Sequence, residues 1–193
     1  MKKIILIMMI NLIIISCKSN FLESELEAYN PYKVGDTLIF KSSKNNIDSF
    51  LITNKEIFWT SWTPIERDGW YNPTNAVIKY KKINNYESWK RKVFLENGES
   101  EFLHIWKHSP GNIRIMLLFN GFLSENINNF GELQTIELNV GKLILTDYFE
   151  ILPYCDECQR RRSDGIIKVY WSKKYGILKY VFKSGEVWER TNL

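Results

Sequence analysis

Two cysteines separated by two residues carry the clearest chemical potential in this sequence. Cys155 and Cys158 enclose an aspartate and a glutamate, and three arginines follow at 160–162. This spacing occurs in local disulfides, redox dithiols and metal sites. A disulfide across so small a loop would contribute about 2 kcal/mol, whereas a redox dithiol needs a lowered thiol pKa. The two intervening carboxylates would raise that pKa, although the arginines act in the opposite direction. We therefore predict a disulfide between Cys155 and Cys158, with a redox or metal-binding pair as the alternatives.

The sequence contains two histidines, His104 and His108. Together with the two cysteines they suggest a zinc site at first sight. In a β-strand, however, residues four apart are separated by about 13 Å, too far to share an ion whose bonds are about 2 Å long. We expect His104 to face one side of a strand and His108 to lie at its exposed end. The sequence accordingly predicts no metal site and no cofactor.

Familiar catalytic motifs are missing from the sequence. It has no Gly-x-Ser-x-Gly nucleophile elbow and no Gly-x-x-x-x-Gly-Lys-Ser/Thr phosphate loop. A glycosidase needs two carboxylates that face a cleft, and nothing in the sequence singles out a pair among the 22 acidic residues. The sequence thus predicts no catalytic residues and favours a protein that is not an enzyme.

Aromatic side chains crowd one region of the chain. Trp59, Trp62, Trp70 and Tyr71 lie within thirteen residues, and they have two interpretations. Aromatic pairs commonly stabilise sheets and cores by packing. The same side chains could instead form a platform on which a glycan or an acyl chain stacks. We take these four residues as the candidate ligand-binding site.

The N-terminus has the pattern of a secretory signal peptide, with two lysines before an apolar run from Ile4 to Ile15. That run is shorter than the ~20 residues that span a bilayer. The end of the segment resembles a bacterial lipoprotein signal, with Ile14 at −3, Ser16 at −1 and Cys17 as the residue that carries the lipid. An uncleaved anchor and an ordinary secretory signal are the alternatives. We predict that residues 1–16 are removed and that Cys17 carries acyl chains such as palmitate, because two or three chains anchor stably where one is marginal.

Removal of residues 1–16 would lower the net charge from +4 to +2, because two lysines are lost. A nearly balanced charge without a clustered basic face gives no indication of a nucleic-acid partner. The predicted partners are the membrane, through Cys17, and an unknown ligand or envelope protein. A location outside the cytoplasm also favours oxidation of the two remaining cysteines.

The rest of the chain divides into a polar segment, 17–31, interpreted as a lipidated tether with a possible short helix, and one β-rich domain, 32–193. Apolar and β-branched runs of four to eight residues alternate with turn residues throughout this domain. The predicted strands are 37–41, 48–53, 56–60, 76–81, 90–95, 101–107, 113–119, 133–138, 142–149, 166–171, 176–182 and 187–190, and 120–132 is expected to form a short helix or a loop.

Short turns connect many of these strands. Asn97-Gly98 favours a tight hairpin, and Ser109-Pro110-Gly111-Asn112, Val140-Gly141 and Ser184-Gly185 supply further turn residues. Strands joined by such short turns are antiparallel neighbours, since parallel pairs need long crossover connections. The predicted fold is therefore all-β, a single-domain antiparallel meander. So many strands must curl or stack, so we expect a half-open barrel or a sandwich.

Both ends of this domain resemble small uncharacterised envelope lipoproteins of the Bacteroidota. The resemblance lies in the opening segment, Tyr29-Asn30-Pro31-Tyr32-Lys33-Val34-Gly35-Asp36-Thr37-Leu38-Ile39-Phe40, and in the closing hairpin, Val169-Tyr170-Trp171-Ser172-Lys173-Lys174-Tyr175-Gly176-Ile177-Leu178-Lys179-Tyr180. It also includes the terminal strand, Gly185-Glu186-Val187-Trp188-Glu189-Arg190. It covers about forty residues and implies a location in the envelope, at the outer membrane, and a β-rich fold. It implies no catalytic residues, and Gly35 and Gly176 match turn positions.

These observations lead us to expect a lipid-anchored envelope protein that binds an unknown ligand or partner without catalysis. One alternative is an envelope thiol–disulfide oxidoreductase that uses Cys155 and Cys158. A second alternative is a carrier of lipid or another hydrophobic ligand, which would require an apolar tunnel or groove inside a β shell.

Overall fold

The structure of the protein, a computed structural model, describes residues 17–18, 20–60, 71–83, 99–109, 111–127, 132–134, 137–140, 143–154 and 165–193. Strands dominate these residues, together with one short 3-10 helix, η1 (Glu23–Leu26). The strands are β1 (Cys17–Lys18), β2 (Thr37–Ser42), β3 (Ile47–Trp59), β4 (Tyr71–Asn72), β5 (Thr74–Lys82), β6 (Ser100–Ser109), β7 (Asn112–Phe119), β8 (Phe122–Ile127), β9 (Glu132–Gln134), β10 (Leu138–Val140), β11 (Leu143–Leu145), β12 (Tyr148–Ile151), β13 (Ile166–Ser172), β14 (Gly176–Phe182) and β15 (Val187–Arg190).

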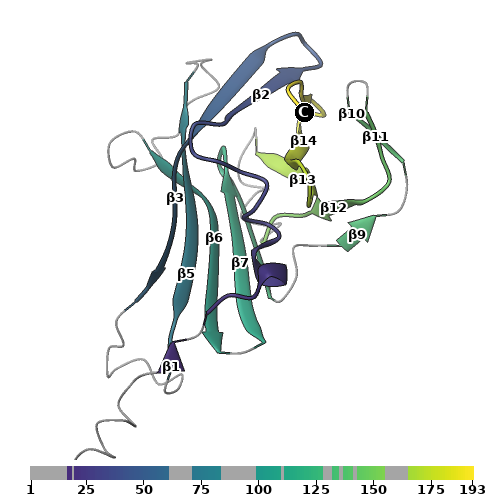
Figure 1. The fold of residues 1–193 in the computed structure, drawn as a ribbon. Coiled ribbons are helices and arrows are strands. Elements are labelled where there is room, and N and C mark those ends of the chain that lie inside the picture. The colour runs from purple at the N-terminus through teal and green to yellow at the C-terminus, as the bar shows by residue number, and fades with distance from the viewer. Residues whose placement is uncertain are drawn as a thin grey trace, which may run out of the picture.

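Eleven of the strands described form one antiparallel sheet in the order β8-β7-β6-β5-β3-β2-β15-β14-β13-β12-β9. The order contains two meanders, one from β2 to β8 and one from β9 to β15. Pairing of β2 with β15, which lie at opposite ends of the domain sequence, joins the two meanders. The sheet curls into a half-barrel (Figure 1), which confirms the predicted all-β class and selects the barrel-like alternative over the sandwich.

The two edges of this sheet lie close together. The chain passes from the end of β8 at Ile127 to the start of β9 at Glu132, and five residue steps span at most about 18 Å. A backbone hydrogen bond of 3.0 Å also links the Tyr154 N–H, just after β12, to the Leu123 carbonyl in β8. Edge strands expose unpaired backbone groups, and this hydrogen bond satisfies one of them on β8.

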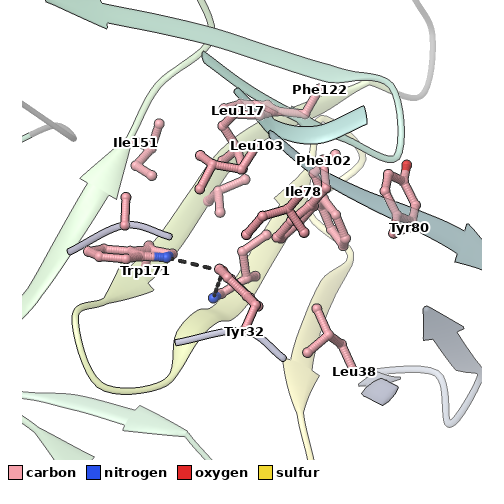
Figure 2. Packing of buried hydrophobic residues seen from close by; sticks show 14 of the residues in the cluster. Tyr32, Leu38, Ile78, Tyr80, Phe102, Leu103, Leu117, Phe122, Ile151 and Trp171 are labelled. Atoms are coloured by element: carbon pink, nitrogen blue, oxygen red, sulfur yellow. Dashed lines mark hydrogen bonds between the residues drawn. The ribbon is translucent and has the colours of Figure 1, made fainter. Parts of the chain in front are cut away.

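The core fills the concave side of the half-barrel. It combines aromatic and aliphatic side chains from both meanders, and in Figure 2 Ile78, Phe102 and Leu103 lie opposite Ile151 and Trp171. The rings meet largely edge to face, for example Phe40 and Tyr180 with centroids 5.1 Å apart. Edge-to-face packing is a favourable arrangement for aromatic pairs. These side chains therefore hold the two meanders against each other.

The N-terminal segment runs across this concave side and closes the core. Ala28, Tyr29 and Tyr32 are buried, and Phe21 and Leu26 pack against the core. Tyr32 is fixed at its hydroxyl oxygen, which accepts hydrogen bonds from the Ile177 N–H (2.9 Å) and the Trp171 indole N–H (3.1 Å; Figure 2). Burial raises the pKa of Tyr32 well above its usual range, so the hydroxyl stays neutral.

The structure therefore corrects the interpretation of 17–31 as a tether. From Phe21 onward this segment belongs to the packed body, and η1 is the short helix that was expected within it. The prediction missed the packing because the segment reads as polar, although its apolar side chains at Phe21, Leu26 and Ala28 all reach the core.

Most of the predicted strands match the observed ones, with four informative differences. The single strand predicted at 133–138 covers parts of β9 and β10, and the single strand predicted at 142–149 covers β11 and part of β12, which belong to different sheets. The strands predicted at 48–53 and 56–60 form one continuous strand, β3, with a register shift between Ile52 and Asn54. The helix or loop predicted at 120–132 is wrong, because 122–127 form β8 and 132–134 form β9. The strand predicted at 90–95 and the Asn97-Gly98 turn lie outside the described residues.

Candidate functional site

A groove of about 920 Å³ lies on the convex face of the half-barrel, the face opposite to the core. Its volume falls within the range typical of small-molecule sites. Strands β2, β14 and β15 form its floor, and the β10–β11 hairpin forms one wall, visible in Figure 1 as the arm beside the C-terminus. The side chains or backbone that line it belong to Lys41, Ser42, Ser43, Val140, Leu143, Lys179, Val187, Glu189, Arg190, Thr191 and Leu193.

Alternation along the strands explains the composition of the floor. Successive strand residues point to opposite faces of a sheet. Phe40, Tyr180 and Trp188 point into the core, so their neighbours Lys41, Lys179, Val187 and Glu189 point outward. The register then aligns Lys41, Glu189 and Lys179 in one row across β2, β15 and β14.

A second apolar cluster holds the hairpin wall in place. It contains the buried side chains of Leu138, Val140, Tyr148 and Leu178. Leu178 has no cross-strand partner, because the register between β13 and β14 shifts from Tyr170–Lys179 to Trp171–Ile177. This bulge turns an apolar side chain toward the convex face, where it anchors the hairpin. The groove is thus a consequence of one extra residue in β14.

Among the charged side chains that line the groove, Lys41, Lys179 and Arg190 are basic and Glu189 is acidic. Lys179 Nζ lies 3.0 Å from the Glu189 carboxylate, which neutralises that pair. Lys41 is exposed, and within the described residues it makes no ion pair, so its ammonium group is available to a ligand. Arg190 borders the groove, but burial lowers its pKa and its guanidinium donates a hydrogen bond to the Tyr175 carbonyl.

The apolar wall and the cationic floor together suit a ligand with an acidic head and an apolar body. Leu143 and Val187 provide the apolar contacts, and Lys41 provides the charge. Long lysine side chains commonly offer a hydrocarbon stem along apolar surface and a charged tip in water. The arrangement is suited to binding, since the acidic side chain among the lining residues, Glu189, is already paired.

The predicted aromatic site is only partly described. Trp59 is the last residue of β3 and is 46% exposed. Tyr71 lies in β4, whose parallel partner is β1, so the backbones of Tyr71 and Cys17 are neighbours. Trp62 and Trp70 lie outside the described residues. The platform of four side chains therefore stays a prediction.

His104 takes part in a structural cluster on the convex face. Its Nε2 lies 3.0 Å from Asn75 Oδ1, its Nδ1 lies 3.6 Å from a Glu101 carboxylate oxygen, and its ring lies against Trp106. The hydrogen bond with His104 lowers the pKa of Glu101. His108 lies in the same strand, near its end. Among the described residues no three His, Cys, Asp or Glu side chains gather as metal ligands.

Cys155 and Cys158 lie outside the described residues, in the connection from β12 to β13. Their predicted disulfide, and the redox and metal alternatives, stay predictions. Cys17 forms β1 with Lys18, and its lipidation likewise stays a prediction. No helix in the described part of the chain is long and apolar enough to cross a membrane.

Sequence reasoning missed the groove. The alternation of β2 and β15 could have shown that Lys41 and Glu189 face away from the core. No local pattern, however, reveals that β2, the first strand of one meander, pairs with β15, the last strand of the other. Comparisons of this chain with protein-family models, with curated proteins and with solved structures found no match.

Proposed function

We propose that this protein is a lipid-anchored envelope protein that binds an anionic ligand with an apolar part, without catalysis. The observation that carries the proposal is the convex groove, in which Lys41 lies beside an apolar wall. The lipid anchor is supported by the sequence around Cys17, and the outer-membrane location by the resemblance of the two ends of the domain.

The groove is a better candidate for the ligand than the interior of the half-barrel. A carrier that encloses its ligand needs an apolar tunnel, and the concave side is instead filled by buried side chains from both meanders and from the N-terminal segment. Protein interiors packed in this way leave few voids larger than a water molecule. This packing argues against the carrier alternative.

The proposal is tested with two probes of equal chain length and opposite charge, octanoate and octyltrimethylammonium. Binding of each to the mature protein is followed by the rise in Tm and by titration calorimetry, because a ligand that binds only the folded state raises stability. Octanoate is expected to bind more tightly. Lys41→Glu is expected to remove this preference, with a small fall in Tm in the absence of probe, because the new carboxylate lies directly opposite Glu189.

Lys81→Glu is the matched control, because Lys81 is also an exposed strand lysine of the same sheet but lies outside the groove. Equal binding of the two probes, or equal effects of the two substitutions, would contradict the assignment of the groove.

Measurement of the intact mass of the protein, extracted from its own membranes, tests the lipid anchor. The expected mass is that of residues 17–193 plus acyl chains. Alkylation of the denatured protein tests whether Cys155 and Cys158 are free thiols. Two alkylated thiols would favour the redox alternative over the disulfide.

A further inference from the structure

The N-terminal segment is fixed to the body almost immediately after Cys17. Lys107 Nζ donates hydrogen bonds to the Asn20 carbonyl (2.9 Å) and to the Glu25 carboxylate (2.8 Å). The same Glu25 oxygen accepts a hydrogen bond from the Leu22 N–H (2.7 Å). Lys107 is 4% exposed, and removing one partner from a buried ion pair is strongly unfavourable. This contact therefore holds the chain in place from Asn20 onward.

Little chain remains between Cys17 and this fixed point. Three residue steps separate Cys17 from Asn20, and they reach at most about 11 Å. In addition, β1 pairs with β4, so Cys17 lies beside Tyr71, three residues before the start of β5. Acyl chains on Cys17 would consequently leave the protein at this end of the half-barrel, where β1 lies in Figure 1.

Exposed apolar side chains are found at the same end. Trp59 pairs in register with Thr74, and Thr74 pairs with Lys107, so Trp59 and Lys107 point to the same face in one row. Leu22 is 63% exposed, and its backbone N–H donates a hydrogen bond to Glu25, the residue that also binds Lys107. Ile57 is 46% exposed. Leu22, Ile57 and Trp59 are defined here as the anchor-end surface. Tryptophan with its apolar body and polar N–H is typical of membrane–water interfaces.

The groove lies at the opposite end of the sheet. Ile47, the first residue of β3, pairs with Lys41 in the groove, whereas Trp59 is the last residue of β3. Twelve steps along a strand correspond to about 40 Å. A membrane at the anchor end would thus leave the groove open to the aqueous compartment.

We infer that the anchor-end surface rests on the lipid bilayer that holds Cys17, so that the body has one fixed orientation and presents its groove away from the membrane. This inference rests on the lipid anchor of the proposed function and goes beyond it, since an anchored protein with a long tether would have no preferred orientation. The occupant of the surface is a lipid bilayer, because at most about 11 Å of chain separates the acylated residue from the body.

Two positions on one strand provide the test. Trp59→Cys and Ile47→Cys are each labelled with the fluorophore NBD, since both native side chains are exposed, 46% and 51%. The lipidated proteins are reconstituted into phosphatidylcholine–phosphatidylglycerol vesicles with and without doxyl-labelled lipid. Because doxyl groups quench only nearby fluorophores, at least a twofold quenching is expected at position 59 and little or none at position 47. The unsubstituted protein, treated with the same reagent, supplies the background from native thiols.

Each outcome has a defined meaning. Equal quenching at the two positions, or stronger quenching at position 47, would overturn the inference in a protein that intact mass shows to be acylated. A mass without acyl chains would overturn the anchor itself and with it the inference. Ile57→Cys is the second variant if Trp59→Cys fails to fold. Insertion of twenty Gly and Ser residues after Lys18 is expected to reduce quenching at position 59, and unchanged quenching would contradict the role of the short connection.

Discussion

At the scale of single residues, the buried hydroxyl of Tyr32 is held by contacts from two strands. It accepts two hydrogen bonds from groups that are themselves buried, one on β13 and one on β14. Gly176, at the start of β14, lies directly against it, so that a methyl group added there would overlap the Tyr32 hydroxyl and ring. The N-terminal segment and the closing hairpin therefore fit together only because position 176 has no side chain.

Two glycines separate this steric effect from the effect of the backbone. Gly176 and Gly185 both have positive φ, +75° and +83°, but the space around Gly185 is open. Alanine at positive φ costs about 1–2 kcal/mol, and overpacking costs a further ~1–3 kcal/mol. Gly185→Ala is expected to lower the free energy of unfolding by the backbone cost alone. Gly176→Ala is expected to lower it by the backbone cost plus the overpacking cost. Urea denaturation measures the two losses. Equal losses would show that Tyr32 can move away from the added methyl group without a cost in stability.

At the scale of elements, the turns predicted the fold where they were recognised. The turn at 109–112 joins β6 to β7, and Ser184-Gly185 joins β14 to β15, as the sequence indicated. Asn120-Gly121 is the same dipeptide as the Asn97-Gly98 that predicts a hairpin, although it lies in the segment predicted as a helix or loop. Both residues have positive φ, +48° and +84°, and they connect β7 directly to β8. The signal for β8 was therefore present, because this dipeptide favours a two-residue turn.

Other elements could not be predicted from local sequence. The β2–β15 pair joins Lys41 to Glu189 across almost 150 residues, and no turn marks it. The burial of Ala28, Tyr29 and Tyr32 depends on a concave face that exists only after the sheet has curled. The groove depends on two long-range features. Its floor needs the β2–β15 pair, and its wall needs the bulge at Leu178. Periodicity reports which face of a strand is buried, but not which distant strand lies beside it.

At the scale of the whole molecule, the shared core makes stability sensitive to alkaline pH. Tyr32, Tyr80 and Tyr180 lie in this core, and burial raises the pKa of each above the usual value of 10.0. Unfolded tyrosines release their protons near pH 10, while the folded protein retains them. The unfolded state then binds fewer protons, so the free energy of unfolding is fully present below pH 10 and falls above it.

Each buried tyrosine is expected to contribute about 1.4 kcal/mol per pH unit to this fall. Urea denaturation at pH 8.5, 10 and 11 measures the slope for the parent protein and for Tyr180→Phe. The variant is expected to lose stability less steeply, since lysine titration affects both proteins alike. Parallel slopes would show that Tyr180 titrates equally in the folded and unfolded states.

The last strand of the chain unites the molecule. β15 lies between β14 and β2, and its Trp188 is buried and stacked on Tyr180 with centroids 5.8 Å apart. Without β15 the sheet would divide into two meanders, each with a new open edge and half of the core. Each meander would then expose to water the apolar side chains that the other meander now covers. The protein should therefore fold as one cooperative unit only when its final residues are present.

Removal of residues 187–193 is expected to abolish the cooperative thermal transition seen by circular dichroism. Removal of Leu193 alone is the matched control, because Thr191 and Asn192 still bond to β2 and the transition should persist. Trp188→Ala, which keeps the backbone of β15, should lower the free energy of unfolding by about 3–5 kcal/mol without removing the transition. If the chain that ends at 186 unfolded cooperatively at the midpoint of the full protein, the two meanders would be independently stable. The β2–β15 pair would then be a contact between two domains and not the centre of one sheet.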